Sequence, residues 1–396
     1  MEHAGIVSAA VVPFEFVSAG RIVFGSGVAK SLGERARKLG RRALWVTGKD
    51  RARAGSLEAQ LVQAGLALAI FSVAGEPRIE DALAAVEAGR QLDVELVVAC
   101  GGGSVLDLGK AAAALLANPR DPYDFLEVVG RGQPLAQSAL PLIAIPTTAG
   151  TGAEVTKNAV LASSEHAVKA SLRHDSMLPA VALVDPELTL SMPAAVTAST
   201  GLDALTQCLE PFVSVQNNPL TDALALEGMR RGAKALPLAF RDGSNLAARE
   251  DMALCSLFGG LALANAKLGA VHGFAAPLGG QFAAPHGAVC ARLLPLVVQA
   301  NVAALRARAP QSPLLQRFEQ VARVLTGRAN ASIEDGIAFI DDLGRELAVP
   351  PLASYGMTAA DIPGVVAKAA VASSMKGNPI ELTTAELSDV LTRAFG

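Results

Sequence analysis

The sequence has few cysteines and few aromatic residues. Its 396 residues include only four cysteines, which lie far apart and form no CxxC pair. A disulfide framework or a cysteine-rich zinc site is therefore not expected. Aromatic residues make up 4% of the chain and hydrophobic residues 51%. This balance, together with abundant alanine, indicates large apolar cores built from closely packed helices.

Charge is sparse and shows no strong bias of sign. The formal net charge is -3 and no long basic run occurs, whereas nucleic-acid binding requires a basic surface. No Lys or Arg precedes Arg21, so the positive start of a signal peptide is missing. No stretch approaches the ~20 uninterrupted apolar residues of a membrane span. We expect a cytoplasmic protein with neither a nucleic-acid nor a membrane partner.

The first half of the chain alternates short apolar runs with helical patterns. We expect strands at 43–47, 66–71, 94–100 and 142–146 and helices at 56–64, 79–92 and 104–117. Continuous apolar strands separated by helices are typical of a parallel sheet covered on both faces. Three further runs predict strands that form a hairpin at the sheet edge, at 159–162, 168–172 and 181–184.

The second half has helical periodicity almost throughout, with helices expected at 194–213, 219–240, 245–268 and 313–325. Single cores stop growing near ~250–300 residues, so a chain of this length predicts two domains. We place an α/β domain at 1–192 and an all-helical domain at 193–396. Because no long linker separates them, the two domains are expected to pack together and form a cleft.

A glycine-rich turn follows the strand expected at 94–100. It reads Gly101-Gly102-Gly103-Ser104 and opens the next helix. Glycines let the backbone approach an anion closely, and a helix N-terminus supplies free N–H donors and a favourable dipole. Ser104 is placed either to cap this helix or to bind a phosphate oxygen. The turn is not GxGxxG, so an ordinary strand-to-helix turn stays an alternative.

A second loop of similar character follows the strand expected at 142–146. It contains Thr147, Thr148, Gly150, Thr151 and Gly152. In open α/β sheets, ligands bind at the carboxyl ends of the strands. Two loops rich in hydroxyls and glycines at this edge favour a phosphate-bearing ligand more strongly than either loop does alone.

Five longer motifs occur along the chain in a specific order. They are GGGSVLDLGK, IPTTAGTGAEVT, VDPELTLSMP, TGLDALTQCLE and AVHGFAAPLGGQFAAPHG. In this order and at these spacings they resemble the iron-containing (group III) alcohol dehydrogenases, and the resemblance covers residues 20 to 395. It implies an α/β dinucleotide-binding domain with a parallel sheet, followed by an all-α metal-binding domain, a fold related to that of dehydroquinate synthase.

The resemblance also implies roles for individual residues of the first domain. The glycine turn matches the family's pyrophosphate loop, with Asp107 beside the nicotinamide end. The full set of cofactor-binding residues that it implies is Gly48, Gly101, Gly102, Gly103, Ser104, Asp107, Thr147, Thr148, Thr151, Lys169 and Leu188.

The choice between NAD and NADP depends on the position of Gly48. Family members that prefer NAD often carry Asp there, and an acidic residue at this place binds the adenosine ribose. Here Lys49, Arg51 and Arg53 follow Gly48 instead. This favours NADP, although basic residues of a loop are often merely solvated.

The second domain carries the candidate metal ligands. Asp203 and Gln207 lie four residues apart and share one face of an expected helix. A break at Pro277–Gly280 is expected to fold His272 and His286 toward each other. The resemblance implies Asp, His, His and His as ligands, so Gln207 stands where a histidine is usual. An amide oxygen is a weaker ligand than imidazole, but three protein ligands suffice for a catalytic zinc, as in the related glycerol dehydrogenases. The metal is expected to be Fe2+ or Zn2+.

Together these residues predict an NAD(P)-dependent alcohol dehydrogenase or aldehyde reductase. Asp203, His272 and His286 are the expected catalytic residues, because a metal that they hold would polarise the substrate oxygen during hydride transfer. Many family members have a histidine at the position of Ala276, so the proton must travel by another route here. Phe274, Phe282 and the small Ala275 and Ala276 are expected to line an apolar pocket with room for a bulkier or carboxylated aldehyde.

Two alternatives remain open. Gln207 and Ala276 are also compatible with a metal-independent enzyme that resembles the maleylacetate reductases. A catalytically degenerate nucleotide-binding protein on the same scaffold is the other alternative, since a fold alone does not determine function. Family members usually self-associate, so a homodimer is expected.

Overall fold

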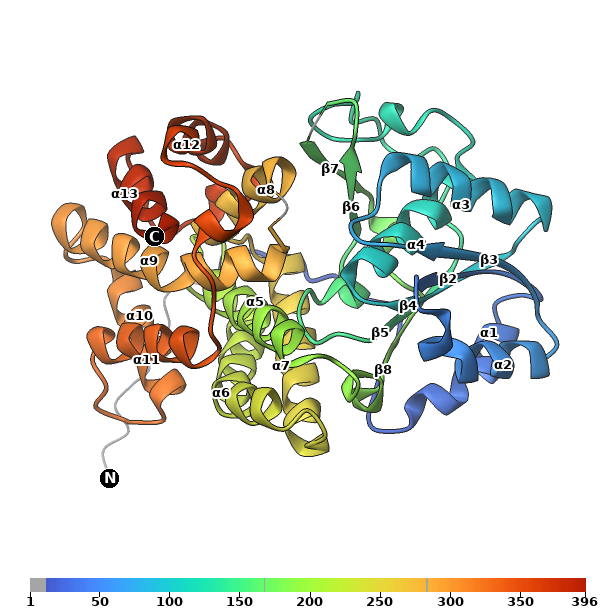
Figure 1. The fold of residues 1–396 in the computed structure, drawn as a ribbon, viewed down its shortest axis with the longest axis horizontal. Coiled ribbons are helices and arrows are strands. Elements are labelled where there is room, and N and C mark those ends of the chain that lie inside the picture. Colours follow the sequence, from blue (N-terminus) through green and yellow to red (C-terminus); the bar gives the residue numbers. More distant parts are fainter. Residues whose placement is uncertain (1–11, 167, 283) are drawn as a thin grey trace.

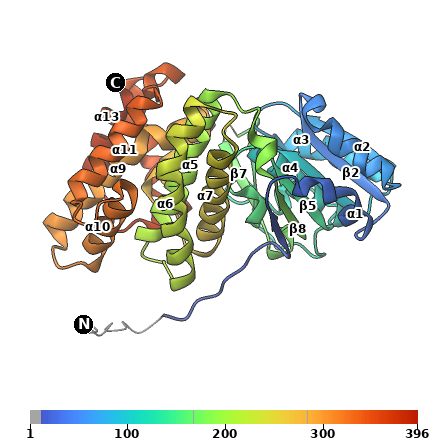
Figure 2. The same ribbon diagram turned by 90° about the horizontal axis from the view of Figure 1, so that it is seen from below.

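The structure is a computed structural model that describes residues 12–166, 168–282 and 284–396. The chain forms an α/β half and a helical half that lie side by side (Figures 1 and 2). The α/β half ends after strand β8 (Val181–Val184), and helix α5 (Ala194–Val213) is the first long helix of the other half.

A parallel sheet forms the centre of the α/β half. Six of the described strands make it up, in the order β1-β8-β5-β4-β2-β3, and neighbouring strands pair in parallel. Besides β8, these strands are β1 (Ile22–Phe24), β2 (Arg42–Gly48), β3 (Ala67–Val73), β4 (Leu96–Gly101) and β5 (Leu142–Pro146). The central strands β4 and β5 are buried along their whole length, as expected of a sheet covered on both faces.

Helices cover both faces of this sheet. Helices α1 (Leu32–Arg37) and α2 (Gly55–Gln63) lie on one face, and α3 (Ile79–Gln91) and α4 (Gly103–Ala117) on the other (Figure 1). Side chains of a strand alternate between the two faces. Trp45 therefore packs in the core with α1 and α2, whereas Leu44 packs in the core with α3 and α4. The predicted sheet covered on both faces is confirmed.

The expected edge hairpin is only partly correct. Strands β6 (Asn158–Ser163) and β7 (Val168–Arg173) do pair in antiparallel, but they form a separate two-stranded sheet. Strand β8 lies inside the main sheet, between β1 and β5. Its four residues are all buried, and so short an apolar run has no periodicity that separates an edge strand from an interior one. The short strand β1 was not predicted.

The helical half has one extended apolar core in which α5 packs against several other helices. After α5 its helices are α6 (Pro219–Arg241), α7 (Leu246–Asn265), α8 (Ala270–Gln281), α9 (His286–Arg308), α10 (Pro313–Thr326), α11 (Ile333–Glu346), α12 (Ile362–Ala370) and α13 (Thr384–Phe395). The all-helical prediction is confirmed, although α7 ends at Asn265, earlier than expected.

The break expected at Pro277–Gly280 is wrong. Helix α8 continues through Pro277 to Gln281, and the chain turns between there and His286, where α9 begins. An internal proline removes one backbone hydrogen bond and kinks a helix, yet α5, α6 and α9 each contain one as well. Packing around these helices therefore outweighs the local cost of proline. The sharp bend lies earlier, between α7 and α8, at 97°.

Helix α9 is long and apolar enough to cross a membrane by length and composition alone. However, 72% of its most apolar window is buried inside the protein. Its apolar side chains, including Val289, Leu293 and Val297, belong to the core of the helical half. This pattern is typical of the core helix of a globular domain.

Candidate functional site

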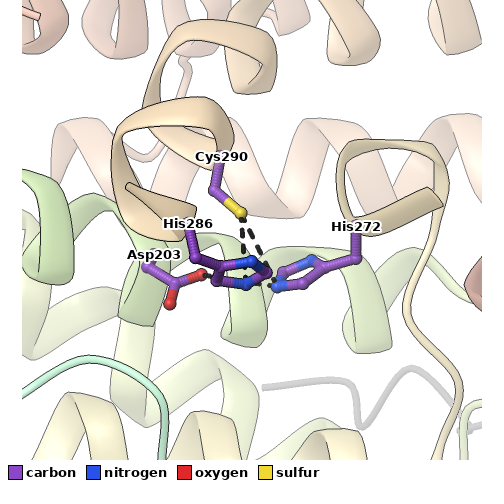
Figure 3. Close-up of side chains that lie close together, drawn as sticks. All are labelled: Asp203, His272, His286 and Cys290. Atoms are coloured by element: carbon purple, nitrogen blue, oxygen red, sulfur yellow. Dashed lines mark hydrogen bonds and ion pairs between the residues drawn. The ribbon is translucent and has the colours of Figure 1, made fainter. Parts of the chain in front are cut away.

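Four side chains with metal-binding chemistry converge in the helical half (Figure 3). Asp203 comes from α5, His272 from α8, and His286 and Cys290 from α9. One candidate ligand atom of each lies within 4.8 Å of those of the other three. Three of the side chains are buried, and that of His286 is 35% exposed. Residues that are distant in the sequence thus form one compact polar cluster.

Two imidazole nitrogens lie between the carboxylate and the sulfur of this cluster. Asp203 Oδ1 is 3.3 Å from His272 Nε2 and 3.8 Å from His286 Nε2. Cys290 Sγ is 3.9 Å from His272 Nε2 and 3.7 Å from His286 Nε2. The two rings are tilted by 51° to each other. The Nε2 atoms therefore face the same small region, as Figure 3 shows.

Glu210 orients one of these rings from behind. Its Oε2 lies 2.6 Å from His272 Nδ1, and its Oε1 accepts the backbone N–H of Val271 at 2.7 Å. An ionised carboxylate only accepts, so Nδ1 carries a proton and Nε2 is the nitrogen that faces the cluster, where it can hold a second proton or bind a metal. Metal-binding histidines are typically held in this way.

Two buried oxygens, one in the cluster and one a helical turn away on α5, have no hydrogen-bond partner among the described residues. Asp203 Oδ1 and Gln207 Oε1 accept no hydrogen bond from any described residue, and both side chains belong to residues that are at most 2% exposed. Leaving a buried acceptor unsatisfied costs about 1–3 kcal/mol. A divalent cation bound by carboxylate and imidazole ligands would remove this cost at Asp203. The residues present therefore fit a metal.

The cluster also shifts the protonation of its own members. Cys290 and Asp203 raise the pKa of His286 to about 9 against the opposing effect of burial. Burial would lower the pKa of His272, but Cys290, Asp203 and Glu210 together raise it well above its ordinary value. Protons and a metal therefore compete for the same imidazole lone pairs, so metal binding must release protons.

The glycine turn leaves the start of α4 open to an anion. Gly102 is the N-cap residue of α4, no side chain caps the helix, and its first turn contains no acidic residue. Ser104 thus does not cap the helix, so that alternative is wrong: its position inside the first turn comes too late for an N-cap. The first amides of such a helix need a partner, and a phosphate can supply it.

The two glycine- and threonine-rich loops pack against each other. The N–H of Thr147 donates to the carbonyl of Gly101 at 3.0 Å. A Cβ atom at Gly103 would lie 2.9 Å from the side chain of Thr151, and one at Gly102 would lie 3.4 Å from that of Thr148. The small size of these glycines therefore lets the loops approach each other at the carboxyl ends of β4 and β5.

A cleft of about 400 Å³ connects this edge of the sheet with the helical half. Its lining residues are Gly75, Glu76, Ser104, Lys169, Gly279, Phe282, Ala284 and Pro285. Lys169 Nζ lies 3.2 Å from Glu76 Oε1. The cleft thus borders both the glycine turn and Pro285, the residue before His286.

Phe282 lines the cleft as expected. Phe274 is instead fully buried in the helical core, so the prediction that Phe274 lines the pocket is wrong. Phe274 lies two residues from His272, which places it on a different side of α8.

Three other residues that were expected to bind the cofactor do not line this cleft. Asp107 accepts the backbone N–H of Val160 at 3.0 Å and lies 2.9 Å from Lys110 Nζ, so protein groups occupy its carboxylate. Leu188 packs against the core beneath α1 and α2. Gly48 ends β2, and a Cβ atom there would meet nothing within 4 Å.

Cys290 is the site residue that sequence reasoning missed. The motif Pro285-His286-Gly287 drew attention to the histidine, and the missing CxxC pair excluded only cysteine-rich sites. The available signal was the spacing of four residues between His286 and Cys290. On a helix this spacing places both side chains on one face.

Comparisons with known proteins agree with this architecture. The model of the family "Iron-containing alcohol dehydrogenase" matches residues 19–186, and that of the C-terminal part of the Fe-containing alcohol dehydrogenase family matches residues 197–395. A 1,3-propanediol dehydrogenase of Klebsiella pneumoniae is 36% identical over 388 residues, which cover 94% of this chain and 96% of the relative.

Solved structures show the same similarity. A 1,3-propanediol oxidoreductase is 33% identical, with a TM-score of 0.90 over 97% of this chain and 100% of that one. A sulfoacetaldehyde reductase of Bifidobacterium kashiwanohense, solved in complex with NAD+, is 30% identical, with a TM-score of 0.84 over 96% of this chain and 98% of that one. The fold and the site thus define an oxidoreductase that acts on CH–OH groups. The chain belongs to the iron-containing alcohol dehydrogenase family.

Proposed function

We propose that this protein is an NAD(P)-dependent alcohol dehydrogenase that also reduces aldehydes, and that a divalent metal in its helical half takes part. One observation carries the proposal: Asp203, His272 and His286 converge, and one cleft is lined both by Pro285, the residue before His286, and by Ser104 of the glycine turn. A nucleotide that binds at this turn would extend along the cleft toward the metal-binding cluster.

In this proposal the α/β half binds the cofactor and the helical half binds the metal. The open amides at the start of α4 would bind the cofactor's pyrophosphate, while Lys169 and Phe282 border the path of the remaining cofactor and substrate. Asp203, His272 and His286 would hold the metal, which when bound supplies Lewis-acid polarisation of the substrate oxygen. Glu210 keeps Nε2 of His272 turned toward the metal-binding cluster.

Proton transfer cannot use a side chain at position 276. Ala276 lies one turn after His272 on α8, where its methyl group can neither donate nor accept a proton. We infer that water or a hydroxyl of the cofactor ribose moves the proton. His286, whose side chain is 35% exposed at the edge of the cluster, leaves room for such water.

We infer that NADP is accepted, and that the preference for it is modest. No carboxylate at Gly48 repels a 2′-phosphate, and the space beside it is open. However, Arg51 is ion-paired with Glu58, and Arg53 with Asp50 at 3.2 Å. The exposed Lys49 is therefore the cation best placed to meet the phosphate. The relative solved with NAD+ indicates that this family fold also accommodates the unphosphorylated cofactor.

The test follows the near-ultraviolet absorbance of NADPH and NADH with a panel of aldehydes, keto acids and maleylacetate, before and after chelation. We expect turnover that chelation abolishes and that added Zn2+ or Fe2+ restores. Unchanged activity in Asp203→Ala and His272→Ala would instead support the metal-independent alternative that Gln207 motivates. Tight nucleotide binding without turnover of any substrate would support the degenerate binding protein.

We also propose that the protein is a cytoplasmic homodimer without nucleic-acid or membrane partners. The support is the net charge of -3, the burial of the apolar helix α9 and the tendency of family members to self-associate. Light scattering coupled to size-exclusion chromatography tests the dimer, and a monomer at micromolar concentration would refute it.

A further inference from the structure

Cys290 belongs to the metal-binding cluster, although no motif in the sequence around it predicts a metal ligand. It lies one helical turn after His286 on α9 and is fully buried. Its sulfur lies 3.7 Å and 3.9 Å from the two Nε2 atoms that also approach Asp203 (Figure 3). We propose that Cys290 is the fourth protein ligand of the metal, in place of the histidine that Gln207 replaces, and that the resulting centre favours Zn2+ over Fe2+. This inference rests on the metal-dependent function proposed above.

The distances between the four ligand atoms agree with a tetrahedral site. With Zn–N and Zn–O bonds near 2.1 Å and a Zn–S bond near 2.3 Å, the expected separations are about 3.4 Å for O···N and about 3.6 Å for S···N. The O···N separations here are 3.3 Å and 3.8 Å, and the S···N separations are 3.7 Å and 3.9 Å. Adjustments of a few tenths of an ångström would give these four separations their tetrahedral values, and the remaining N···N and S···O separations are at most 4.8 Å.

A second observation points to a ligand at the same place. Asp203 Oδ1 is buried without a hydrogen-bond donor among the described residues, although it faces two imidazole nitrogens. Glu210 fixes one proton of His272 on Nδ1, and Nε2 faces the carboxylate at 3.3 Å. Two lone pairs at this distance repel, so the carboxylate and Nε2 need either a second proton on the ring or a metal ion between them.

Charge and chemical softness favour the sulfur over the amide of Gln207. Asp203 and a thiolate at Cys290 together balance the two charges of a divalent ion, which matters because an uncompensated charge is costly to bury. The amide oxygen of Gln207 would contribute no charge. Thiolate ligands select zinc, and a cysteine ligand is compatible with alcohol dehydrogenase chemistry at zinc.

The test titrates metal-free protein with Co2+ and records its electronic spectrum. We expect one equivalent to bind with a sulfur-to-cobalt charge-transfer band in the near ultraviolet. Cys290→Ser should lose the band, while Cys255→Ser, which changes a buried cysteine of α7, should keep it. The Co2+ dissociation constant of Cys290→Ser should rise by more than about 100-fold, the upper end of the effect of removing a group that merely supports a ligand.

A rescue variant separates loss of a ligand from loss of structure. Gln207→His in a Cys290→Ala background restores a four-ligand set without sulfur, so we expect tight Co2+ binding without the charge-transfer band. When wild type and this double variant are loaded from equal Zn2+ and Fe2+, the zinc-to-iron ratio should be higher in wild type. NADPH binding should be unchanged in every variant, because the glycine turn lies in the other half.

The possible failures can be told apart. If wild type binds one Co2+ without a sulfur band, or if Cys290→Ser keeps the band and the affinity, the inference about Cys290 is wrong and the proposed function stands. If wild type binds none of Co2+, Zn2+ and Fe2+, the metal-dependent function itself is wrong.

Discussion

Each half of the molecule buries a carboxylic acid almost completely, and the pKa values of the two acids shift in opposite directions. Asp203 is 1% exposed and Glu154 is 2% exposed. Burial would raise the pKa of Asp203, but His286 and His272 hold it below its ordinary value. Burial raises the pKa of Glu154 to about 7, because the one nearby cation, Lys110, only partly opposes it and already pairs with Asp107. The partners of a buried acid, and not burial itself, decide its charge.

The two acids also lie in different kinds of place. Asp203 belongs to the cluster that is expected to bind a metal, where its negative charge would balance part of the charge of the ion. Glu154 lies in a short 3-10 helix (Ala153–Val155) at the junction of the two halves, next to Gly152. A Cβ atom at Gly152, whose φ is +57°, would lie 2.4 Å from the Cα atom of Gly260 in α7. Glu154 is thus buried because the two halves pack closely.

The largest expected effect is that of Asp203→Asn, which keeps the shape of the side chain and removes its charge. We expect kcat/KM to fall by about 10^3-fold, since the polarisation of the substrate oxygen depends on the bound ion. Bound metal, measured by elemental analysis, should fall as well, while NADPH affinity stays the same. Glu154→Gln is the matched control and should keep its metal; equal metal loss in both variants would contradict the comparison.

Glu154→Gln should change the pH dependence of stability. The folded-state pKa is raised from 4.5 to about 7, so the protonated form stabilises the fold below pH 4.5 and this contribution is lost as the pH rises through 7. The loss amounts to about 2.5 kcal/mol between pH 5 and pH 8. The variant should lack it and be more stable than wild type at pH 8.

Urea unfolding at pH 5 and pH 8 measures this difference. Glu34→Gln serves as the control. The pairing of this exposed carboxylate with Lys38 holds its pKa below the ordinary value, so it stays ionised between pH 5 and pH 8, and the change of stability between these pH values should match that of wild type. If Glu154→Gln follows the same pH dependence as wild type, then Glu154 is ionised in the fold and the contrast with Asp203 disappears.

Gly101→Ala tests the backbone chemistry of the α/β half. The added methyl group would lie 2.4 Å from Val105 Cγ2, and overpacking of this kind costs about 1–3 kcal/mol. We expect weaker NADPH binding with unchanged metal content, both measured on the purified variant. Gly55→Ala is the control, because nothing lies within 4 Å of the added atom. A loss of metal together with nucleotide binding would show that the two sites are not independent.

Gly48→Asp should have the smallest effect, on cofactor choice alone. The space beside Gly48 is open, so a carboxylate fits there and would repel a 2′-phosphate by about 1–4 kcal/mol at 4 Å. We expect the ratio of kcat/KM for NADPH to that for NADH to fall by about 10-fold. Gly48→Ala adds bulk without charge and should leave the ratio unchanged; an equal shift in both variants would exclude the electrostatic explanation.

Much of this architecture could be predicted from local patterns in the sequence. Continuous apolar runs such as β4 and β5 exist because both faces of a parallel sheet are buried. The turn at Gly101 marks a strand end because glycines are needed where backbone segments approach closely. Asp203, His272 and His286 stand out because they occur within specific motifs.

Other features depend on which elements meet in space. The sequence of β8 does not reveal that it lies between β1 and β5, since strand order is a matter of long-range pairing. Phe274 is adjacent to the motif around His272, but only the packing of α8 turns it into the core. Pro277 was expected to end a helix that the surrounding contacts in fact maintain.

The sequence by itself determined the α/β and helical halves and the glycine turn, because periodicity and local backbone chemistry act over a few residues. The resemblance of its motifs to a known family implied three of the four converging side chains. Only the tertiary structure placed Cys290 beside His272. It also buried Asp203 and Glu154 in surroundings that shift their pKa values in opposite directions. Such neighbours come from helices and strands that are distant along the chain, and the electrostatics of a buried group depends on the atoms that surround it in space.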